Sequence, residues 1–272
     1  MTVPARPLTF GLVDGLAFAA ARGRLDVTQL PRPYALENLG PLLELFHLAA
    51  GGRLPDPTEG GWLDLNGAAV MIAALREKRE RWFSSAGRRM GLIRVVRGDP
   101  DGDNRFTAFL MDAKRAARDV ARLPGTTPGQ LAAAMQELES NIHEHSGAAD
   151  TGLLAFQAGP GEFEFVAADR GIGILASFQS SSMYASLVDH GKALELALTD
   201  GISRFGEDKG RGHGFRPIFL GLVNLWGSLR FRSGDHALTM DGTSPILTTA
   251  QLAQKATIDG FFVSIRVTRD SG

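Results

Sequence analysis

The sequence predicts an α/β protein with a smaller N-terminal unit and a larger C-terminal unit. Segments of helical periodicity alternate with segments of strand-like alternation along most of the chain. A break rich in Gly, Pro and Asp at residues 97–104 separates two such groups. Because 272 residues can form one or two domains, we place an N-terminal α/β domain at residues 1–100 and a second domain at 104–272.

The composition narrows the class of protein. The chain has 29 basic and 30 acidic residues, so its charge predicts neither nucleic acid nor an anionic membrane as a partner. It has no cysteine, which excludes disulfides and thiolate metal sites and fits the cytoplasm. Its apolar runs are shorter than the roughly 20 residues that span a membrane. Asp14 interrupts the apolar stretch 7–21, which argues against a signal peptide.

The N-terminal unit begins with a short predicted helix among early prolines, followed by an amphipathic helix over 34–50 that ends at two glycines. Next come a short strand at 62–65, a helix over 68–83 and a strand at 92–96. Strand, helix and strand in this order predict a βαβ unit.

The C-terminal unit begins with two predicted helices and a hairpin. The helices cover 106–123 and 127–145, with Thr127 as the N-cap of the second and Pro128 at its first helical position. Two alternating segments, 152–157 and 162–168, are joined at Gly-Pro-Gly and predict a β-hairpin.

The rest of this unit is less regular. It contains a polar stretch over 175–209 with a short helix near 192–198, and an insertion over 241–259 that is longer than a hairpin needs. The remaining predicted elements are a helix at 212–226 and strands at 228–232, 237–240 and 261–267.

A row of polar side chains lies on the second helix of the C-terminal unit. Glu137, Asn141 and His145 are spaced by four and share one helix face, whereas Glu139 points elsewhere. Such a row could hold a metal and a base, but it is equally typical of a solvated helix face. For His145 we favour a local hydrogen bond at the helix end.

A second motif, Asp169-Arg-Gly171-Ile-Gly173, directly follows an alternating strand. Glycines permit positive φ and let the backbone approach a flat or charged ligand. The aspartate can accept a hydrogen bond from an exocyclic amine. Taken alone, this motif predicts only a turn.

The third motif, Gly210-Arg211-Gly212-His-Gly214, opens the predicted helix at 212–226. Unpaired N–H groups at a helix start, with Lys209 and Arg211 beside them, suit a phosphate. A flexible loop leading into a helix is an equally good interpretation. Neither glycine motif is a Walker loop or a dinucleotide-binding fingerprint.

Together, the order and spacing of the three motifs resemble the N, G1 and G2 boxes of the GHKL (Bergerat-fold, histidine-kinase-like) ATPase superfamily. The resemblance covers residues 104–268, about 60% of the chain. It implies a C-terminal α/β sandwich, a mixed sheet with helices on one face, that binds ATP or ADP with Mg²⁺. Residues 175–209 would be its mobile ATP lid.

The resemblance also implies roles for individual residues. Asn141 matches the Mg²⁺ ligand, Glu137 the general base and Asp169 the adenine-reading aspartate. The cofactor-binding residues that accompany them are Gly171, Gly173, Lys209, Gly210, Arg211, Gly212 and Gly214.

Within the superfamily, the N box most resembles that of the anti-sigma-factor serine kinases, which phosphorylate a small antagonist protein of the STAS fold. No histidine here has the sequence context of a phosphoacceptor in a sensor histidine kinase. Residues 62–67 and 92–96 are faintly similar to the latter half of a STAS domain, and a generic α/β domain is the alternative. Many relatives dimerise, so the resemblance also implies a homodimer, alongside a regulatory protein partner.

Two functions remain open after this comparison. One is an ATPase or serine/threonine kinase that transfers the γ-phosphate to water or a protein hydroxyl, with Glu137 as base. The other is a non-catalytic nucleotide-binding module that controls a partner through lid ordering. The superfamily usually places a Gly-Thr before its final strand, whereas here Gly260 is followed by Phe261-Phe262, which favours the second function. A DNA-processing machine is disfavoured, since the chain has no basic excess.

Overall fold

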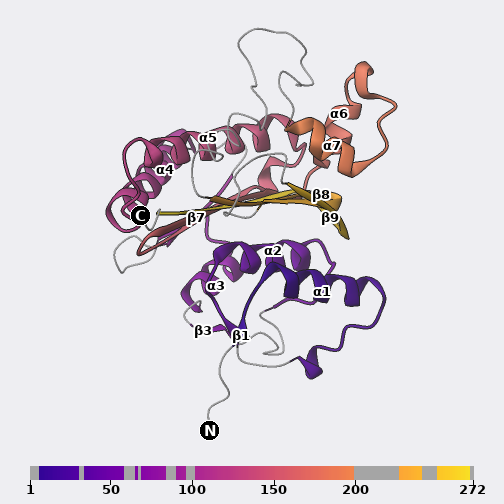
Figure 1. The fold of residues 1–272 in the computed structure, drawn as a ribbon, viewed down its shortest axis with the longest axis horizontal. Helices are drawn as coiled ribbons and strands as arrows, with labels where there is room; N and C mark the ends of the chain where they lie inside the picture. The colour runs from indigo at the N-terminus through magenta and orange to yellow at the C-terminus, as the bar shows by residue number, and fades with distance from the viewer. Residues whose placement is uncertain are drawn as a thin grey trace.

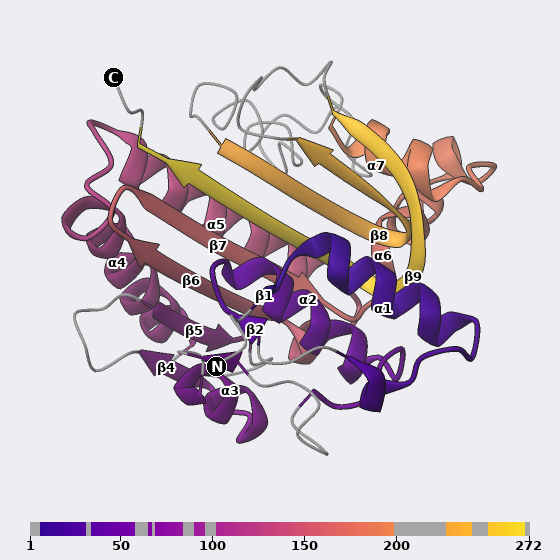
Figure 2. The same cartoon turned by 60° about the horizontal axis from the view of Figure 1, so that its bottom comes forward.

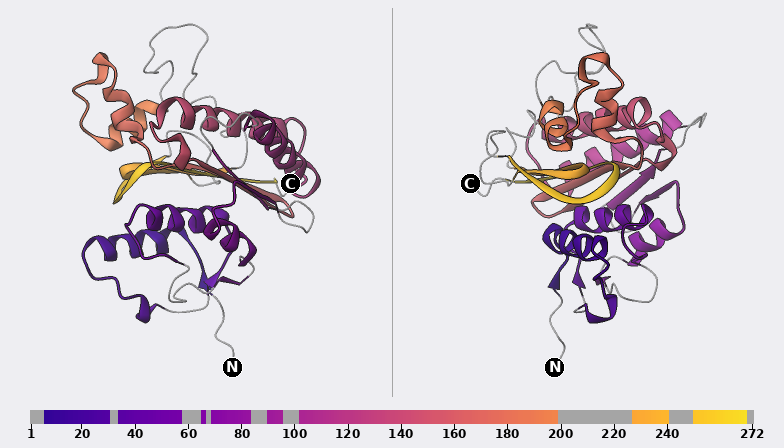
Figure 3. Two further views of the ribbon diagram at one scale, coloured as in Figure 1. Left: turned by 180° about the vertical axis from the view of Figure 1, so that it is seen from behind. Right: turned by 90° about the vertical axis from the view of Figure 1, so that its right-hand side faces the viewer.

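The computed structural model describes residues 6–30, 34–57, 65–66, 69–83, 90–95, 102–198, 227–240 and 250–269. The described elements stack in four layers (Figure 1). Helices α4–α7 cover one face of a large sheet, helices α1–α3 cover the other, and a small sheet lies beyond α1–α3. The two rotated views in Figure 3 show the same order of layers. The large sheet is therefore covered on both faces, whereas the sequence predicts helices on only one.

The large sheet has six strands in the order β4-β5-β6-β7-β9-β8 (Figure 2). Their bounds are β4 Arg81–Phe83, β5 Met90–Arg94, β6 Leu153–Gly159, β7 Glu162–Asp169, β8 Gly227–Met240 and β9 Gln251–Thr268. All its described pairings are antiparallel, so the predicted mixed sheet is wrong. Two consecutive helices lie between β5 and β6 along the chain. They bring the start of β6 beside the end of β5, so that Leu153 pairs with Arg94.

The predicted hairpin is confirmed by β6 and β7. These strands pair from Leu153↔Ala168 to Gly159↔Glu162, leaving a two-residue loop. The second loop residue, Gly161, has φ +78°, a conformation that glycine adopts without steric cost.

The last two strands differ from the prediction. Three strands are expected at 228–232, 237–240 and 261–267, but β8 and β9 are each continuous, with a register shift around Gly234. Gly234 has φ +57° at this irregularity. Residues 251–259 of the predicted insertion form the first half of β9, and 241–249 lie outside the described residues.

Helices on the first face enclose the larger core. They are α4 Gly102–Asp119, α5 Thr127–His145, α6 Gly173–Gln179 and α7 His190–Ala197. In this core, Phe109 from α4 meets Phe156 from β6 at a centroid distance of 5.4 Å, and Leu138 and Ile142 from α5 are fully buried. The N-cap of α5 is Thr126 and not Thr127, and it makes no side-chain capping bond.

The N-terminal elements alternate strand and helix three times. They are β1 Arg6–Pro7, α1 Phe10–Ala21, β2 Tyr34–Ala35, α2 Leu39–Ala50, β3 Leu65–Asn66 and α3 Ala69–Arg76. The strands form a parallel sheet in the order β1-β2-β3. The predicted βαβ unit is therefore wrong in its partners, because β3 pairs with β2, and β5 joins the large sheet. The predicted helix 68–83 ends at Arg76, and residues 81–83 form β4.

Glu164 fastens the N-terminal helices to the large sheet. This β7 carboxylate is buried and accepts hydrogen bonds from the N–H groups of Leu39 and Gly40 at the start of α2, and from Ser264 Oγ. A negative charge at a helix N-terminus is favourable. A Cβ on Gly40 would lie 2.4 Å from Ser264 Oγ, so α2 can approach the sheet this closely only with glycine there.

A buried ion network lies further along the same interface. Arg230 donates to both carboxylate oxygens of Glu44, at 2.6 and 2.8 Å, and to Asp14 Oδ1 at 2.6 Å. Arg232 also contacts Glu44, and Lys255 Nζ lies 2.8 Å from Asp14 Oδ2. These contacts join α1 and α2 to β8 and β9 as one body.

Candidate functional site

Asp169 is the last residue of β7 and lies on the face of the large sheet that α4–α7 cover. Its side chain is 1% exposed, and Oδ1 accepts the Gly171 N–H at 2.7 Å. Oδ2 is buried and has no hydrogen-bond partner among the described residues. Burial raises the pKa of this carboxyl to about 7, against the opposing effect of the Gly171 hydrogen bond. An unsatisfied buried acceptor is costly and calls for a ligand or another donor to explain it.

Glycines pack the turn after Asp169 against two neighbouring segments. A Cβ on Gly171 would lie 1.9 Å from the Ser146 carbonyl oxygen at the end of α5. The adjacent Ile172 N–H donates to that same oxygen at 2.8 Å. On β9, a Cβ on Gly260 would lie 2.0 Å from the Asp169 carbonyl oxygen. The sequence predicts that the backbone at Gly171 approaches a ligand. In the structure this backbone instead packs against the end of α5.

The start of α6 is held by β8 and β9. Ser233 Oγ accepts the Ile174 N–H at 3.0 Å and donates to the Gly260 carbonyl at 2.8 Å. Gly173, which precedes Ile174, has φ +76°, the positive value that the motif predicts. Phe261 packs in the core beneath α4–α7, while Phe262 packs against the N-terminal helices. Phe261 and Phe262 are thus both core residues of β9.

The polar row on α5 points partly toward solvent. Glu137 is exposed, whereas Asn141 is half-buried. The helix that carries this row contacts the Asp169 turn at its C-terminal end, where the Ile172 N–H donates to the Ser146 carbonyl. Asn141 and Asp169 are thus carried by two segments that touch.

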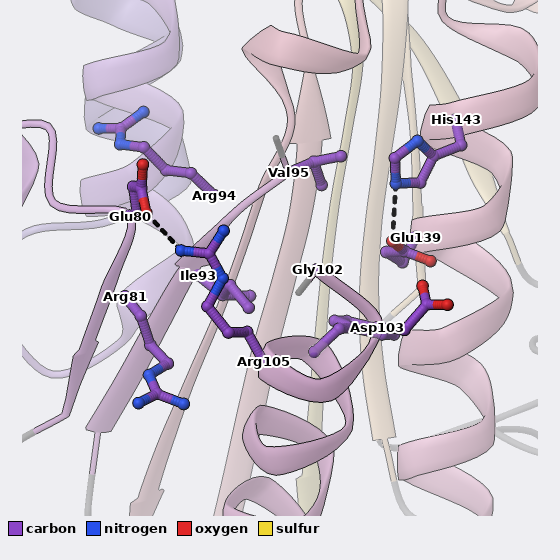
Figure 4. A pocket seen from close by; sticks show the side chains of 11 residues that line it. Glu80, Arg81, Ile93, Arg94, Val95, Gly102, Asp103, Arg105, Glu139 and His143 are labelled. Carbon is purple, nitrogen blue, oxygen red and sulfur yellow. Dashed lines mark hydrogen bonds and ion pairs between the residues drawn. The ribbon is translucent and has the colours of Figure 1, made fainter. Parts of the chain in front are cut away.

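Sequence reasoning missed a cavity on the other side of α5. Figure 4 shows Glu139 and His143 pointing into it together, with Asp103 close by. The cavity has a volume of about 230 Å³, and His143 Nε2 lies 2.9 Å from Glu139 Oε1. Burial raises the pKa of Glu139, and His143 opposes that effect. The four-residue spacing of these two side chains is the signal that could have indicated the pair.

The predicted lid is structured in its described part. Residues 175–198 include most of α6 and all of α7, and Leu175, Phe178 and Leu194 are buried in the main core. Residues 199–209 lie outside the described residues, as do Lys209, Gly210, Arg211, Gly212 and Gly214.

Within the described ranges, no three His, Cys, Asp or Glu side chains are grouped so as to hold a metal ion. The same part of the chain has no helix both long and apolar enough to cross a membrane. Family models, curated proteins and solved structures all yield no match to this chain.

Proposed function

We propose that residues 104–272 form an ATP- and Mg²⁺-binding domain of the GHKL type, closest to the anti-sigma-factor serine kinases. In this proposal the γ-phosphate passes to water or to a serine or threonine hydroxyl of a protein partner. The observation that carries the proposal is the buried Asp169 carboxylate, whose Oδ2 has no partner among the described residues. Above about pH 7, where this carboxyl is ionised, Oδ2 is an acceptor that suits the exocyclic amine of adenine, a hydrogen-bond donor.

In this proposal two residues of α5 serve phosphoryl transfer, one as a Mg²⁺ ligand and one as the general base. Mg²⁺ bound with ATP would neutralise the phosphate oxygens during transfer. Since the described residues hold no metal cluster, phosphates and water would supply most of its ligands, and the Asn141 amide oxygen would add one. Glu137, exposed one turn earlier, can accept the proton of an attacking hydroxyl.

Nucleotide titration calorimetry tests the proposal. In Asp169→Asn the oxygen that accepts the Gly171 N–H is kept, so the new NH₂ faces the adenine amine, donor against donor. We expect Mg·ATP affinity to fall by about 10- to 100-fold, while the surface variant Asp119→Asn binds as the wild type. The wild type should also prefer ATP to GTP, because guanine places a carbonyl where adenine has its amine.

Assays of phosphate release and of phosphotransfer to protein hydroxyls measure turnover separately from nucleotide binding. Glu137→Gln should keep nucleotide affinity and lose turnover. Glu144→Gln, an exposed change on the same helix, should leave both affinity and turnover unchanged. Equal ATP affinity in the wild type and Asp169→Asn would refute the proposed site.

A second candidate is a nucleotide-binding switch without turnover. The fully buried Phe262 and the core position of Phe261 favour it, since no hydroxyl follows Gly260 to contact the phosphates. ATP binding by the wild type without phosphate release, unchanged in Glu137→Gln, would support this candidate.

A further inference from the structure

A second cavity, of about 320 Å³, lies between the N-terminal helices and the ends of β5–β7. Apolar side chains from α2 form part of its wall, including Leu43 and Phe46. The charged residues that line it are Asp56, Arg76, Lys78, Arg94 and Arg170. Four cations therefore share this space with one carboxylate.

Arg94 and Arg170 are half-buried in this wall. Arg94 Nη2 donates to the Leu75 carbonyl at 3.2 Å, and Arg170 Nη1 donates to the Ala50 carbonyl at 2.5 Å. Among the described residues neither guanidinium is ion-paired with a carboxylate, and Arg94 Nε is buried without a hydrogen-bond partner. Arg94 also lines the Glu139 cavity, and Figure 4 shows its guanidinium pointing away from Glu139 and His143.

The two fully buried arginines in the described part of the chain, by contrast, have carboxylate partners. Arg230 and Arg232 are both ion-paired with Glu44 in the buried network. At the second cavity, burial and the positive charge of Arg170 together lower the pKa of Arg94. Two partly desolvated cations that repel each other would both gain from an anion placed between them.

We propose that this cavity binds a phosphate-bearing small molecule, with Arg94 and Arg170 holding the phosphate and the apolar wall of α2 contacting the organic part. Guanidinium forks match the oxygens of a phosphate, and such charge-assisted bonds are strong. The volume is that of a small-ligand site. A dianion also offsets part of the excess positive charge.

The site is separate from the one around Asp169. Successive residues of a strand face opposite sides of the sheet, and at the end of β7 both Ala168 and Arg170 line this cavity. Asp169, between them, faces the side covered by α5 and α6. The inference therefore does not depend on the proposed ATPase function.

Titration of the full-length protein with phenyl phosphate tests the inference. We expect Arg94→Gln and Arg170→Gln each to weaken binding at least about tenfold, and added salt to weaken it in the wild type. Arg79→Gln is the matched control, because Arg79 is exposed, follows Lys78 and pairs with Glu77 away from the cavity. Asp169→Asn should bind as the wild type, which separates this site from the nucleotide site.

A second variant leaves both arginines in place. Ala50 is exposed at the end of α2 and lines the cavity, so Ala50→Phe should fill space there and weaken binding without loss of charge. Benzoate and inorganic phosphate should both bind more weakly than phenyl phosphate. Unchanged affinity in both arginine variants, no binding by the wild type, or benzoate binding as tightly as phenyl phosphate would each overturn the proposal.

Discussion

Asp169 is buried and His47 is half-buried, and their pKa values are shifted in opposite directions. Burial raises the pKa of the Asp169 carboxyl to about 7 and lowers that of the His47 imidazole to about 4. His47 Nε2 donates to the Asp259 carbonyl, which partly opposes the effect of burial. Each group is therefore neutral in the folded protein over part of the range in which it is charged in the unfolded chain.

The pH dependence of stability should reveal Asp169. The native state keeps its proton up to about pH 7, while the unfolded chain loses it near pH 4, so this group's contribution falls as pH rises from 4 to 7. A pKa of about 7 in place of 3.8 corresponds to about 4 kcal/mol. In urea unfolding, Asp169→Asn should gain stability relative to the wild type across this window and hold the gain above it.

His47 contributes in the opposite sense, because its stabilising effect is lost as pH falls from about 6.5 to 4. Comparing Asp169→Asn with the wild type at each pH cancels that contribution, and Asp119→Asn controls for loss of a surface charge. A difference that stays constant from pH 4 to 8 would contradict the raised pKa of Asp169.

At the scale of elements, the join between β7, β9 and α6 depends on glycine backbones. Gly260 has φ +67°, and a Cβ there would lie 2.0 Å from a backbone oxygen of Asp169. Both features penalise any side chain, since the obstructing atom belongs to a central strand.

Gly260→Ala should therefore destabilise the protein by about 3 kcal/mol or more, measured by denaturant unfolding. Gly129→Ala is the contrasting change: Gly129 lies within α5 with open space around its Cβ position, so alanine should add about 0.5–1 kcal/mol through helix propensity. Equal effects of the two substitutions would be inconsistent with this packing.

Most of the elements could be predicted because their signals are local. The β6–β7 hairpin follows from alternation and a Gly-Pro-Gly turn, and α5 follows from helical spacing after a proline. The strands β4 and β5 are short, and β5 also pairs with β6, which follows it only after α4 and α5. Periodicity indicates which residues share a face but carries no information about which strand pairs with which.

For the molecule as a whole, the buried ion network joins the N-terminal helices to the large sheet. Glu44 is completely buried and pairs with both Arg230 and Arg232. Removing its charge leaves two buried arginines with one nearby carboxylate fewer. Such a loss is costly, because the desolvated charges keep their penalty without the attraction that compensated it.

Glu44→Gln should accordingly lower the free energy of unfolding by about 3–5 kcal/mol. Glu77→Gln removes an exposed ion pair with Arg79 and should cost at most about 1 kcal/mol. Urea unfolding followed by circular dichroism measures both. A small effect of Glu44→Gln would show that the network does not hold the layers together.

The sequence alone was enough for the α/β class, the hairpin, the helix that carries Glu137 and Asn141, and an acceptor at Asp169 before a glycine turn. Each of these depends on neighbours within a few residues. The candidate site therefore emerged from the sequence as a set of motifs, without the burial that makes the Asp169 carboxylate unusual.

Tertiary packing decided the antiparallel pairing of the large sheet, the covering of its second face and the burial of Glu164, Arg230 and Arg232. It also decided that Arg94 and Arg170 share a cavity without a carboxylate paired to either among the described residues. In a linear sequence a charged residue is by default a surface residue. Whether it is buried, and beside which charge, depends on contacts between segments more than a hundred residues apart, which no local pattern specifies.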